Sequence, residues 1–494
     1  YYRNSAVIAF ANVAQVLFAS SLFGYIFAKF EFRAKNVLFW FILATMMIPA
    51  QVTMVPGYLI LARLGLLNKL IALIIPASID AFGIFLFRQF CKSIPDDLIA
   101  AARVDGASEF LIKECGKDWR VEASVDRTAV LADSDYVINT IEVAGLAKVR
   151  HDYDIPMRYG VDQCIGDTIG PGGLFKALRT LPAWVDILHD TERLAPDALV
   201  MNYTNPMSLT VLTGLRASSL PIVGLCHSIQ HTSDQLADYL GMPVSEIDWR
   251  AAGINHLAWF VQLEHNGEDL YPALLERIKD PAIYEQDPVR FDMMRHLGAF
   301  PTESSGHVSE YTAYYRKRPD LVKTYTRSEY RGESGFYAKH WPIERQEAEQ
   351  EIRAYLSGEE AFEFERGPEF ASYIMEAIET DVPAVIYGNV ANHGLIDNLP
   401  QNGVVEVPCL VDRKGIQPTH FGSLPTQLAI LDAQHMAFHD LVAKAILEQD
   451  REAAVHALMI DPLTAAVCSL AEARALFDEM AGVQAAYLPD FIQA

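Results

Sequence analysis

Long apolar runs dominate the first 112 residues of the chain. Residues 5–28 and 36–62 contain no charged side chain, and residues 70–87 contain only Asp80. Each run is long enough, or nearly so, to cross about 30 Å of hydrocarbon as a helix, although two prolines would kink the second run. The pattern favours membrane helices over buried helices of a soluble domain. It predicts three transmembrane α-helices, at about residues 5–28, 36–62 and 70–90.

Beyond residue 112 the apolar segments become short, and no run of membrane length occurs again. The pattern predicts helices at residues 123–132 and 177–194. It predicts β-strands at residues 136–141, 198–203, 220–225 and 246–252. Strands that alternate with helices are typical of a parallel, doubly wound sheet. The chain is therefore expected to join a membrane segment to an α/β protein.

Charge is distributed unevenly along the chain, whose net charge is −23. Residues 1–112 carry nine Lys and Arg against six Asp and Glu, a net charge of +3, which leaves −26 for the remainder. Such an acidic remainder argues against a nucleic-acid partner. The basic segment 29–35 is expected to be cytoplasmic, and the end of the third helix with it. The six cysteines show no disulfide framework, which suits a reducing compartment.

The segment that follows the third predicted helix, residues 93–110, has a distinctive core. The core reads Ala101-Ala-Arg-Val-Asp-Gly-Ala107, and its glycine permits a turn between two short helices. The segment resembles the cytoplasmic coupling loop of carbohydrate-type ABC-transporter permeases, except that Ala100 stands where that family usually has Glu. The resemblance implies docking on an ABC ATPase subunit. It covers only the middle of a permease, because no further membrane helix follows Phe110.

Candidate chemistry lies at the ends of two predicted strands. Cys226 follows the strand at 220–225, and His256 follows the strand at 246–252. Side chains at the carboxyl ends of parallel strands face the crevice in which α/β folds bind ligands. A thiol and an imidazole there could bind a borderline-soft divalent metal, and His227 could transfer protons. The alternative interpretation is a buried cysteine and a hydrogen-bonded core histidine.

A series of short sequence motifs extends from residue 167 to residue 409. They are Asp167-Thr-Ile-Gly-Pro-Gly-Gly173, Asn202-Tyr-Thr-Asn-Pro-Met207, Gly224-Leu-Cys-His-Ser228, Gly253-Ile-Asn-His256, Thr302-Glu-Ser-Ser-Gly-His-Val-Ser-Glu-Tyr311, Ile386-Tyr-Gly-Asn-Val390, Gly394-Leu-Ile-Asp-Asn-Leu-Pro400 and Val404-Val-Glu-Val-Pro-Cys409. Through these motifs the chain, from about residue 116 to its end, resembles glycoside hydrolase family 4. Its Cys-His-Ser motif resembles the form of this motif in the α-galactosidase branch of the family.

The resemblance implies an NAD- and metal-dependent glycosidase, an exception to two-carboxylate glycoside hydrolysis. Members oxidise the sugar at C3 with bound NAD, remove the C2 proton, eliminate the aglycone, add water and return the hydride. By resemblance, Cys226 and His256 bind Mn²⁺ or another divalent metal. His227 takes the place of the general acid and Tyr311 that of the base, whose high pKa the metal must lower.

The remaining residues of the resemblance concern the substrate and the nucleotide. Asn205 and Asp167 are expected to bind the sugar, whereas His307 is expected to be an ordinary polar residue. Residues 113–137 contain no Gly-x-Gly turn after a strand, so the unit that binds the pyrophosphate is expected to be incomplete. The cofactor-binding residues that remain are Asn139, Thr140 and Glu142.

The expected fold class is α/β, with a truncated Rossmann-like doubly wound sheet and an α+β C-terminal domain, preceded by the three transmembrane helices. The expected domains are a permease fragment at residues 1–112, an incomplete NAD-binding domain at 113–250 and a catalytic domain at 251–494. Together they indicate a fusion, with the hydrolase part cytoplasmic, oligomeric and anchored to the inner membrane.

Two functions of different classes follow from these expectations. The first is an α-galactosidase-like glycosidase, impaired by the missing pyrophosphate loop. The second is a membrane component of a carbohydrate ABC transporter that carries a fused, inactive cytoplasmic domain. A 2-hydroxy-acid dehydrogenase on a similar fold is a third alternative, but such an enzyme needs no metal, and the Cys226–His256 pair argues against it.

Overall fold

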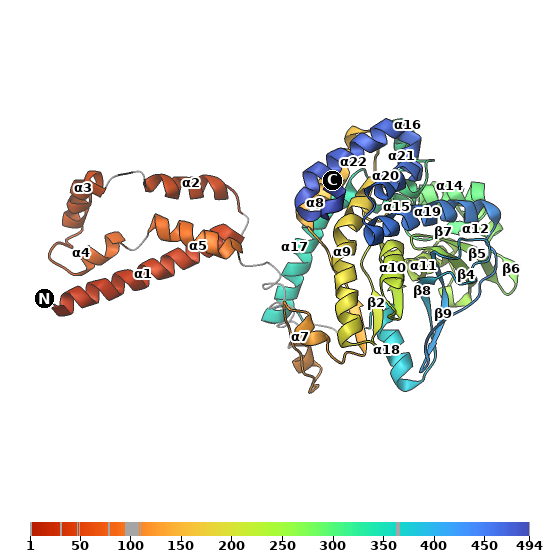
Figure 1. The fold of residues 1–494 in the computed structure, drawn as a ribbon, viewed down its shortest axis with the longest axis horizontal. Coiled ribbons are helices and arrows are strands. Elements are labelled where there is room, and N and C mark those ends of the chain that lie inside the picture. Colours follow the sequence, from red (N-terminus) through yellow and green to blue (C-terminus); the bar gives the residue numbers. More distant parts are fainter. Residues whose placement is uncertain are drawn as a thin grey trace. The chain divides into compact units, whose positions relative to one another are not determined.

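The computed structural model describes residues 2–29, 32–46, 48, 50–77, 80–93, 108, 110–361 and 366–493. The chain divides into two compact units, Tyr1–Arg127 and Thr128–Ala494, drawn in Figure 1. Most of the predicted coupling loop, residues 94–107 and 109, lies outside the described residues.

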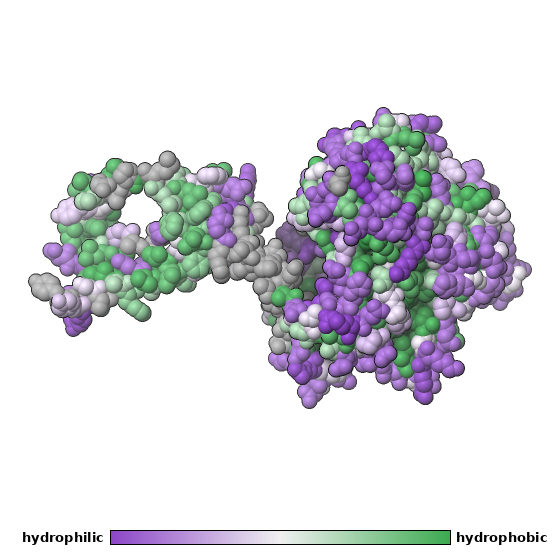
Figure 2. Space-filling view, viewed as in Figure 1, coloured by the Kyte–Doolittle hydropathy of each residue, from purple (hydrophilic) through white to green (hydrophobic). Residues whose placement is uncertain are grey.

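The first unit consists of apolar helices. Its helices are α1 (Tyr2–Lys29), α2 (Lys35–Thr45), α3 (Ala50–Arg63), α4 (Ile71–Ile74), a 3₁₀ turn (Ile75–Ala77) and α5 (Ala81–Ser93). The long helix α1 packs along α5. Phe27, Phe39 and Ile84 form a small buried cluster, and much of the other apolar surface is exposed, as with Phe10 at 78%. Figure 2 shows this mainly hydrophobic surface, in contrast to the mainly hydrophilic second unit.

One of the three predicted membrane helices has the length and composition that a membrane span requires. Among the described residues, one helix, Tyr2–Ala28, is long and apolar enough to cross a membrane. The predicted helix at 36–62 is instead divided into α2 and α3, and that at 70–90 into α4, the 3₁₀ turn and α5. Proline disfavours a helical residue before it and removes a backbone donor. Pro76 lies in the 3₁₀ turn, whereas Pro56 lies within α3. Pro49 lies outside the described residues.

The second unit is built on one mixed sheet. Its strands are β1 (Tyr136–Asn139), β2 (Leu199–Asn202), β3 (Ile222–Leu225), β4 (Asp248–Ile254), β5 (Leu257–His265), β6 (Glu268–Asp269), β7 (Phe300–Pro301), β8 (Ala384–Ala391), β9 (Val404–Asp412) and β10 (Gly415–Pro418). Their order is β1-β2-β3-β8-β9-β4-β5-β6, with β10 beside β9 and β7 beside β5. Only the pairs β1–β2 and β2–β3 among these are parallel.

The prediction of a parallel strand before His256 is therefore wrong. Strand β4 runs antiparallel to both of its neighbours, β5 and β9. It forms a tight hairpin with β5, in which Ile254 pairs with Leu257. The sheet also unites the two segments that we predicted as separate domains, because β8 and β9 lie between β3 and β4.

Helices surround this sheet. They are α7 (Thr128–Leu131), α8 (Leu146–Arg158), α9 (Gly170–Leu194), α10 (Met207–Ala217), α11 (Ser228–Leu240), α12 (Tyr271–Arg277), α13 (Pro281–Tyr284), α14 (Pro288–Leu297), α15 (Ser305–Tyr311), α16 (Pro319–Tyr325), α17 (Phe336–Ser357), α18 (Phe370–Thr380), α19 (Thr426–Glu448), α20 (Arg451–Ile460), α21 (Pro462–Val467), α22 (Leu470–Gln484) and α23 (Asp490–Gln493). Short 3₁₀ turns lie at Val244–Glu246, Glu329–Arg331 and Ala485–Tyr487. Helix α10 packs on β2, β3 and β8 and against α9 (Figure 1), so the largest core lies between these helices and the sheet.

Strand β1 forms one edge of the sheet. It pairs with β2 on one side, and no strand forms in residues 110–135, all of which the structure describes. The helix expected at 123–132 is reduced to the single turn α7. Ile138 of β1 is 48% exposed. The sheet is thus truncated on this side, as the missing Gly-rich unit led us to expect.

Candidate active site

Cys226 and His256 lie close together although their strands are not neighbours. Cys226 directly follows β3, and His256 lies in the β4–β5 turn with a positive φ of 63°. The Cys226 Sγ is 3.4 Å from the His256 Nε2. Burial raises the pKa of the Cys226 thiol, and burial together with the nearby His307 lowers the pKa of His256 to about 4. The pair therefore presents a neutral imidazole beside a thiol.

One row of residues crosses the sheet between these two side chains. Gly224 pairs with Asn389, Asn389 with Glu406, and Glu406 with Gly253. A Cβ on Gly224 would lie 2.6 Å from the Met207 sulfur, and a Cβ on Gly253 would lie 2.7 Å from the Cα of Ala258. Both ends of the row therefore require glycine, because a larger residue would push apart the backbone that carries Cys226 and His256.

A cluster of charged groups lies beside His256. One ligand atom from each of His256, Glu303 and His307 falls within 4.8 Å of the others. The Nδ1 of His307 is 3.6 Å from Glu303, and its Nε2 is 3.7 Å from Asp167. Burial opposes the charged imidazole, but the carboxylates of Glu303, Glu310 and Asp167 outweigh it and raise the pKa of His307 to about 9. His307 is thus part of the candidate site, which our interpretation of it as an ordinary polar residue missed.

Asp167 is buried, and both oxygens of its carboxylate have partners. Its carboxylate accepts from the Thr168 hydroxyl at 2.7 Å and from the Lys176 Nζ at 3.2 Å. Burial opposes its charge, but Lys176 and His307 lower the pKa of Asp167 to about 2. Lys176 also contacts Glu142 at 3.1 Å, and we had not selected this lysine from the sequence. Lys176 and Arg179 are the charged residues of the first part of α9, residues 170–185, which is otherwise uncharged, and this pattern is the signal that could have identified Lys176.

The loop that carries Asp167 is held by a second unpredicted residue, Glu310. The Glu310 carboxylate accepts backbone N–H groups from Cys164 at 2.7 Å, Ile165 at 3.2 Å and Gly166 at 3.0 Å. Three donors on one buried carboxylate fix the loop conformation. Sequence spacing gave no signal for this contact, because the two segments are more than 140 residues apart.

Tyr311 is buried at the end of α15. Its ring lies 5.7 Å from that of His307 and 4.9 Å from that of His435. Burial, followed by the carboxylates of Asp167 and Glu310, raises the pKa of Tyr311 well above its ordinary value. The phenol is therefore protonated unless a cation comes close to it.

Two asparagines present polar atoms without partners among the described residues. The Oδ1 of Asn205 is buried and has no hydrogen bond, and neither the Oδ1 nor the Nδ2 of Asn255 has one. Buried polar groups are almost always paired in folded proteins. Because Asn255 directly precedes His256, these atoms are suited to bind the hydroxyl groups of a ligand.

The predicted nucleotide residues are less suited to their role. The Nδ2 of Asn139 donates to Asn202 at 2.7 Å and to Thr204 at 3.1 Å, so this amide holds β1 to the segment after β2. Glu142 pairs with Lys176, and Thr140 is exposed. Of the three, Thr140 is exposed, Glu142 is partly buried and Asn139 is buried.

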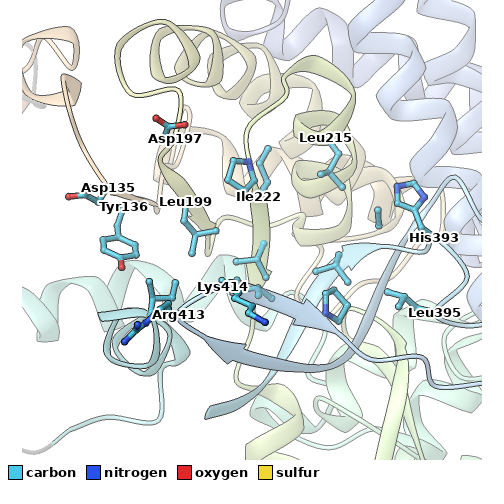
Figure 3. Close-up of a pocket in the computed structure, with 18 of the residues that line it drawn as sticks. Asp135, Tyr136, Asp197, Leu199, Leu215, Ile222, His393, Leu395, Arg413 and Lys414 are labelled. Carbon is cyan, nitrogen blue, oxygen red and sulfur yellow. The ribbon is translucent and has the colours of Figure 1, made fainter. Parts of the chain in front are cut away.

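A cavity of about 810 Å³, drawn in Figure 3, is lined by other residues. Tyr136, Leu199 and Ile222, the first residues of the three parallel strands, line it together with Lys414 of the β9–β10 turn. Ligands of α/β sheets bind at the carboxyl ends of parallel strands, not the amino ends. We therefore place the candidate active site at Cys226 and His256 and not in this cavity.

Three family models match the chain. The family 4 glycosyl hydrolase model matches residues 100–242, and the model of the family 4 glycosyl hydrolase C-terminal domain matches residues 251–464. A third model, of the binding-protein-dependent transport system inner membrane component, matches residues 20–112. These matches agree with the two resemblances that the sequence showed.

Related proteins support the same division. The alpha-galactosidase of Bacillus subtilis is 38% identical over 370 residues, which are 74% of this chain and 84% of the relative. The alpha-galactosidase of Rhizobium meliloti is 36% identical, with 76% of this chain and 78% of the relative covered. Among solved structures, lplD of Bacillus subtilis is 27% identical with a TM-score of 0.65, covering 73% of this chain and 86% of lplD. The 6-phospho-beta glucosidase of Thermotoga maritima, solved with manganese, NAD⁺ and glucose-6-phosphate, is 22% identical with a TM-score of 0.62, covering 78% and 89%, and supports the fold alone.

Proposed function

The chain belongs to the family 4 glycosyl hydrolases, and we propose that its second unit hydrolyses α-galactosides by an NAD- and Mn²⁺-dependent route. One observation carries the proposal: the Cys226 Sγ and the His256 Nε2 are 3.4 Å apart beside buried amide groups that lack partners. The two alpha-galactosidases named above supply the substrate class, because they are the relatives of 36–38% identity.

The donor geometry fits a metal ion. The Cys226 Sγ and the His256 Nε2, 3.4 Å apart, are close enough for both to bind one divalent ion. Cys226 as thiolate and His256 as neutral imidazole would hold the ion, and Glu303 is near enough to His256 to add a carboxylate. Two protein ligands leave positions open for sugar oxygens.

The charged groups beside Cys226 and His256 suit a neutral sugar on which negative charge develops during the reaction. His307 lies between Asp167 and Glu303, and Lys176 lies on the other side of Asp167. We assign Asp167 to sugar hydroxyl groups, since a buried ionised carboxylate is a strong acceptor. Asn205 and Asn255 would bind further hydroxyl groups with the atoms that lack protein partners.

The proposed reaction needs an oxidant at C3 and a Lewis acid, which NAD and the divalent ion supply when bound. Tyr311 is the proposed base for the C2 proton. Its raised pKa means that its phenolate forms only beside positive charge, so the base depends on the ion at Cys226 and His256. His227 is the proposed acid for the leaving group, because it follows Cys226 directly and is exposed at the site.

The nucleotide fits only in part. Residues after β1 can contact it, but residues 110–135 provide neither a strand nor a Gly-rich turn before β1. A helix N-terminus with backbone N–H groups normally binds the pyrophosphate. We therefore propose that turnover is impaired.

A label from solvent tests the proposed route. The full chain in detergent, with NAD, Mn²⁺ and p-nitrophenyl α-galactoside in D₂O, is expected to release galactose that carries deuterium at C2, because the C2 proton is removed and replaced. Mass spectrometry and proton NMR of the released sugar measure this even at slow turnover. The α-glucoside and the α-galacturonide serve as competing substrates. Release of unlabelled galactose, or turnover that does not need NAD, would contradict the proposal.

A membrane component of a carbohydrate ABC transporter is the alternative function. The match of residues 20–112 to the transport-system inner membrane component and the apolar helix Tyr2–Ala28 favour it. In both functions we place the second unit in the cytoplasm, joined to the inner membrane by the first unit. An ABC ATPase at the predicted coupling loop and a homo-oligomer of the hydrolase part are further proposals.

Fractionation measures the membrane attachment. The full chain is expected to stay in the membrane pellet after a wash with alkaline carbonate, since apolar helices resist extraction. Residues 113–494 alone are the control and are expected in the supernatant. Release of the full chain by the wash would exclude an integral membrane role for the first unit.

A further inference from the structure

Glu369 contacts the candidate acid and belongs to none of the motifs that identify the family. It immediately precedes α18, and its Oε1 lies 3.1 Å from the Nδ1 of His227. The two residues are 142 positions apart in sequence. An ionised carboxylate only accepts hydrogen bonds, so the Nδ1 of His227 must carry the proton of this contact.

Neighbouring contacts hold the start of α18 in this place. The backbone N–H of Ala371 donates to the Tyr203 hydroxyl at 3.1 Å, and the Gln230 side chain donates to the Pro368 carbonyl at 3.4 Å. Tyr203 follows β2, and Gln230 lies in α11, which begins directly after His227. Pro368, Glu369 and Ala371 thus tie the start of α18 to the elements that carry the candidate site.

The His227 ring is also restricted by its own helix. His231, one turn further on, lies with its ring centroid 5.0 Å from that of His227 in an edge-on arrangement. The Nε2 of His227 makes no hydrogen bond to any described residue. It is therefore the nitrogen that remains available to a bound molecule, with the other nitrogen engaged by Glu369.

We propose that Glu369 is a positioning residue that fixes the His227 ring with a proton on Nδ1, so that Nε2 faces the leaving-group oxygen. The role rests on the proposed function, in which His227 protonates the leaving group. In the acid form the His227 ring carries a proton on each nitrogen. The Nε2 proton moves to the glycosidic oxygen, which keeps the electron pair of the C1–O bond as that bond breaks. The Nδ1 proton stays between the ring and Glu369, so the ring ends neutral in one defined tautomer.

The ring tautomer tests this role without any need for turnover. In the full chain, labelled with ¹⁵N-histidine and studied in detergent, the Nδ1 of His227 is expected to resonate as a protonated nitrogen. The His227 ring signals are identified as those that disappear in His227→Gln. The variants are then compared at a high enough pH that these signals no longer change with pH. Glu369→Ala is expected to shift the ring toward the Nε2–H tautomer. Glu369→Gln keeps an oxygen acceptor and is expected to retain most of the Nδ1–H form.

Glu376→Ala is the matched control, because Glu376 is an exposed carboxylate of the same helix that pairs with Arg366 instead. It is expected to leave the His227 signals unchanged. An unchanged tautomer in Glu369→Ala would overturn the proposal. So would an equal shift in the control, which would indicate a general loosening of α18.

Leaving-group dependence then separates this role from the proposed function. Glu369→Ala is expected to lower kcat for methyl α-galactoside about tenfold and that for p-nitrophenyl α-galactoside less than about twofold, since only the poor leaving group needs a proton. A shifted tautomer with equal losses on both substrates would retain Glu369 as the residue that orients the ring. It would reject His227 as the acid, and with it the catalytic consequence of the proposal.

Discussion

Restoring a Gly-rich strand–turn–helix–strand unit ahead of Val121 is expected to raise α-galactosidase turnover by about a thousandfold at limiting NAD. Each charge-assisted hydrogen bond to the pyrophosphate contributes about 1.5–3 kcal/mol, and tenfold in binding corresponds to about 1.4 kcal/mol, so two or three such bonds suffice. The measurement compares residues 113–494 with and without the unit, assayed on p-nitrophenyl α-galactoside with NAD, Mn²⁺ and a reductant.

A second graft serves as the control for this experiment. The unit would also pair with the open edge of β1, which could stabilise the sheet without binding the nucleotide. The same graft with valine in place of the turn glycines keeps the added strand but blocks the approach of the pyrophosphate. Comparable turnover in the ungrafted protein would show that the remaining pocket suffices. Equal gains from both grafts would assign the defect to the sheet edge.

Cys226→Ala and His256→Ala are each expected to weaken Mn²⁺ binding by at least about a hundredfold. The reason is that each removes one of the two proposed ligands, whereas loss of a residue that merely supports a ligand costs about 10–100-fold. The signal of free Mn²⁺ in electron paramagnetic resonance measures the affinity of the full chain. This readout does not depend on turnover.

Cys468→Ala is the matched thiol control, because Cys468 is also free and partly buried. His307→Asn separates the two donor sets that share His256. If Cys226 and His256 hold the ion, His307→Asn is expected to leave the affinity within about tenfold of the unsubstituted chain. Loss of binding in His307→Asn with retention in Cys226→Ala would assign the ion to His256, Glu303 and His307.

The sequence predicted those features that depend on neighbouring residues. Apolar segments gave the positions of β1, β2 and β3 within about two residues, and α1, which is uncharged over residues 5–28, met the length needed to cross a membrane. The motif that begins at Gly224 identified Cys226 as a candidate site residue, and Cys226 lies at the end of a strand, where such residues were expected. In each case the information lies within one short stretch of chain.

Features that depend on distant segments could not be predicted in the same way. The insertion of β8 and β9 between β3 and β4 made the sheet mixed, and nothing in the segment before His256 indicates whether its neighbours are parallel. Glu310, Lys176 and Glu369 act through contacts with remote backbone or side chains. Their residue types alone are typical of a solvated surface, so the fold is needed to show what each of them contacts.

The junction between β4 and β9 gives the proposed metal a mechanical role. Glu406 and Gly253 are the single pair that joins these two strands, so the sheet is narrowest there. Cys226 belongs to the β3 side of that junction and His256 to the β4–β5 hairpin on the other. An ion bound to both side chains would therefore connect the two sides of this junction, at which the strands β4 and β9 are joined through one pair of residues.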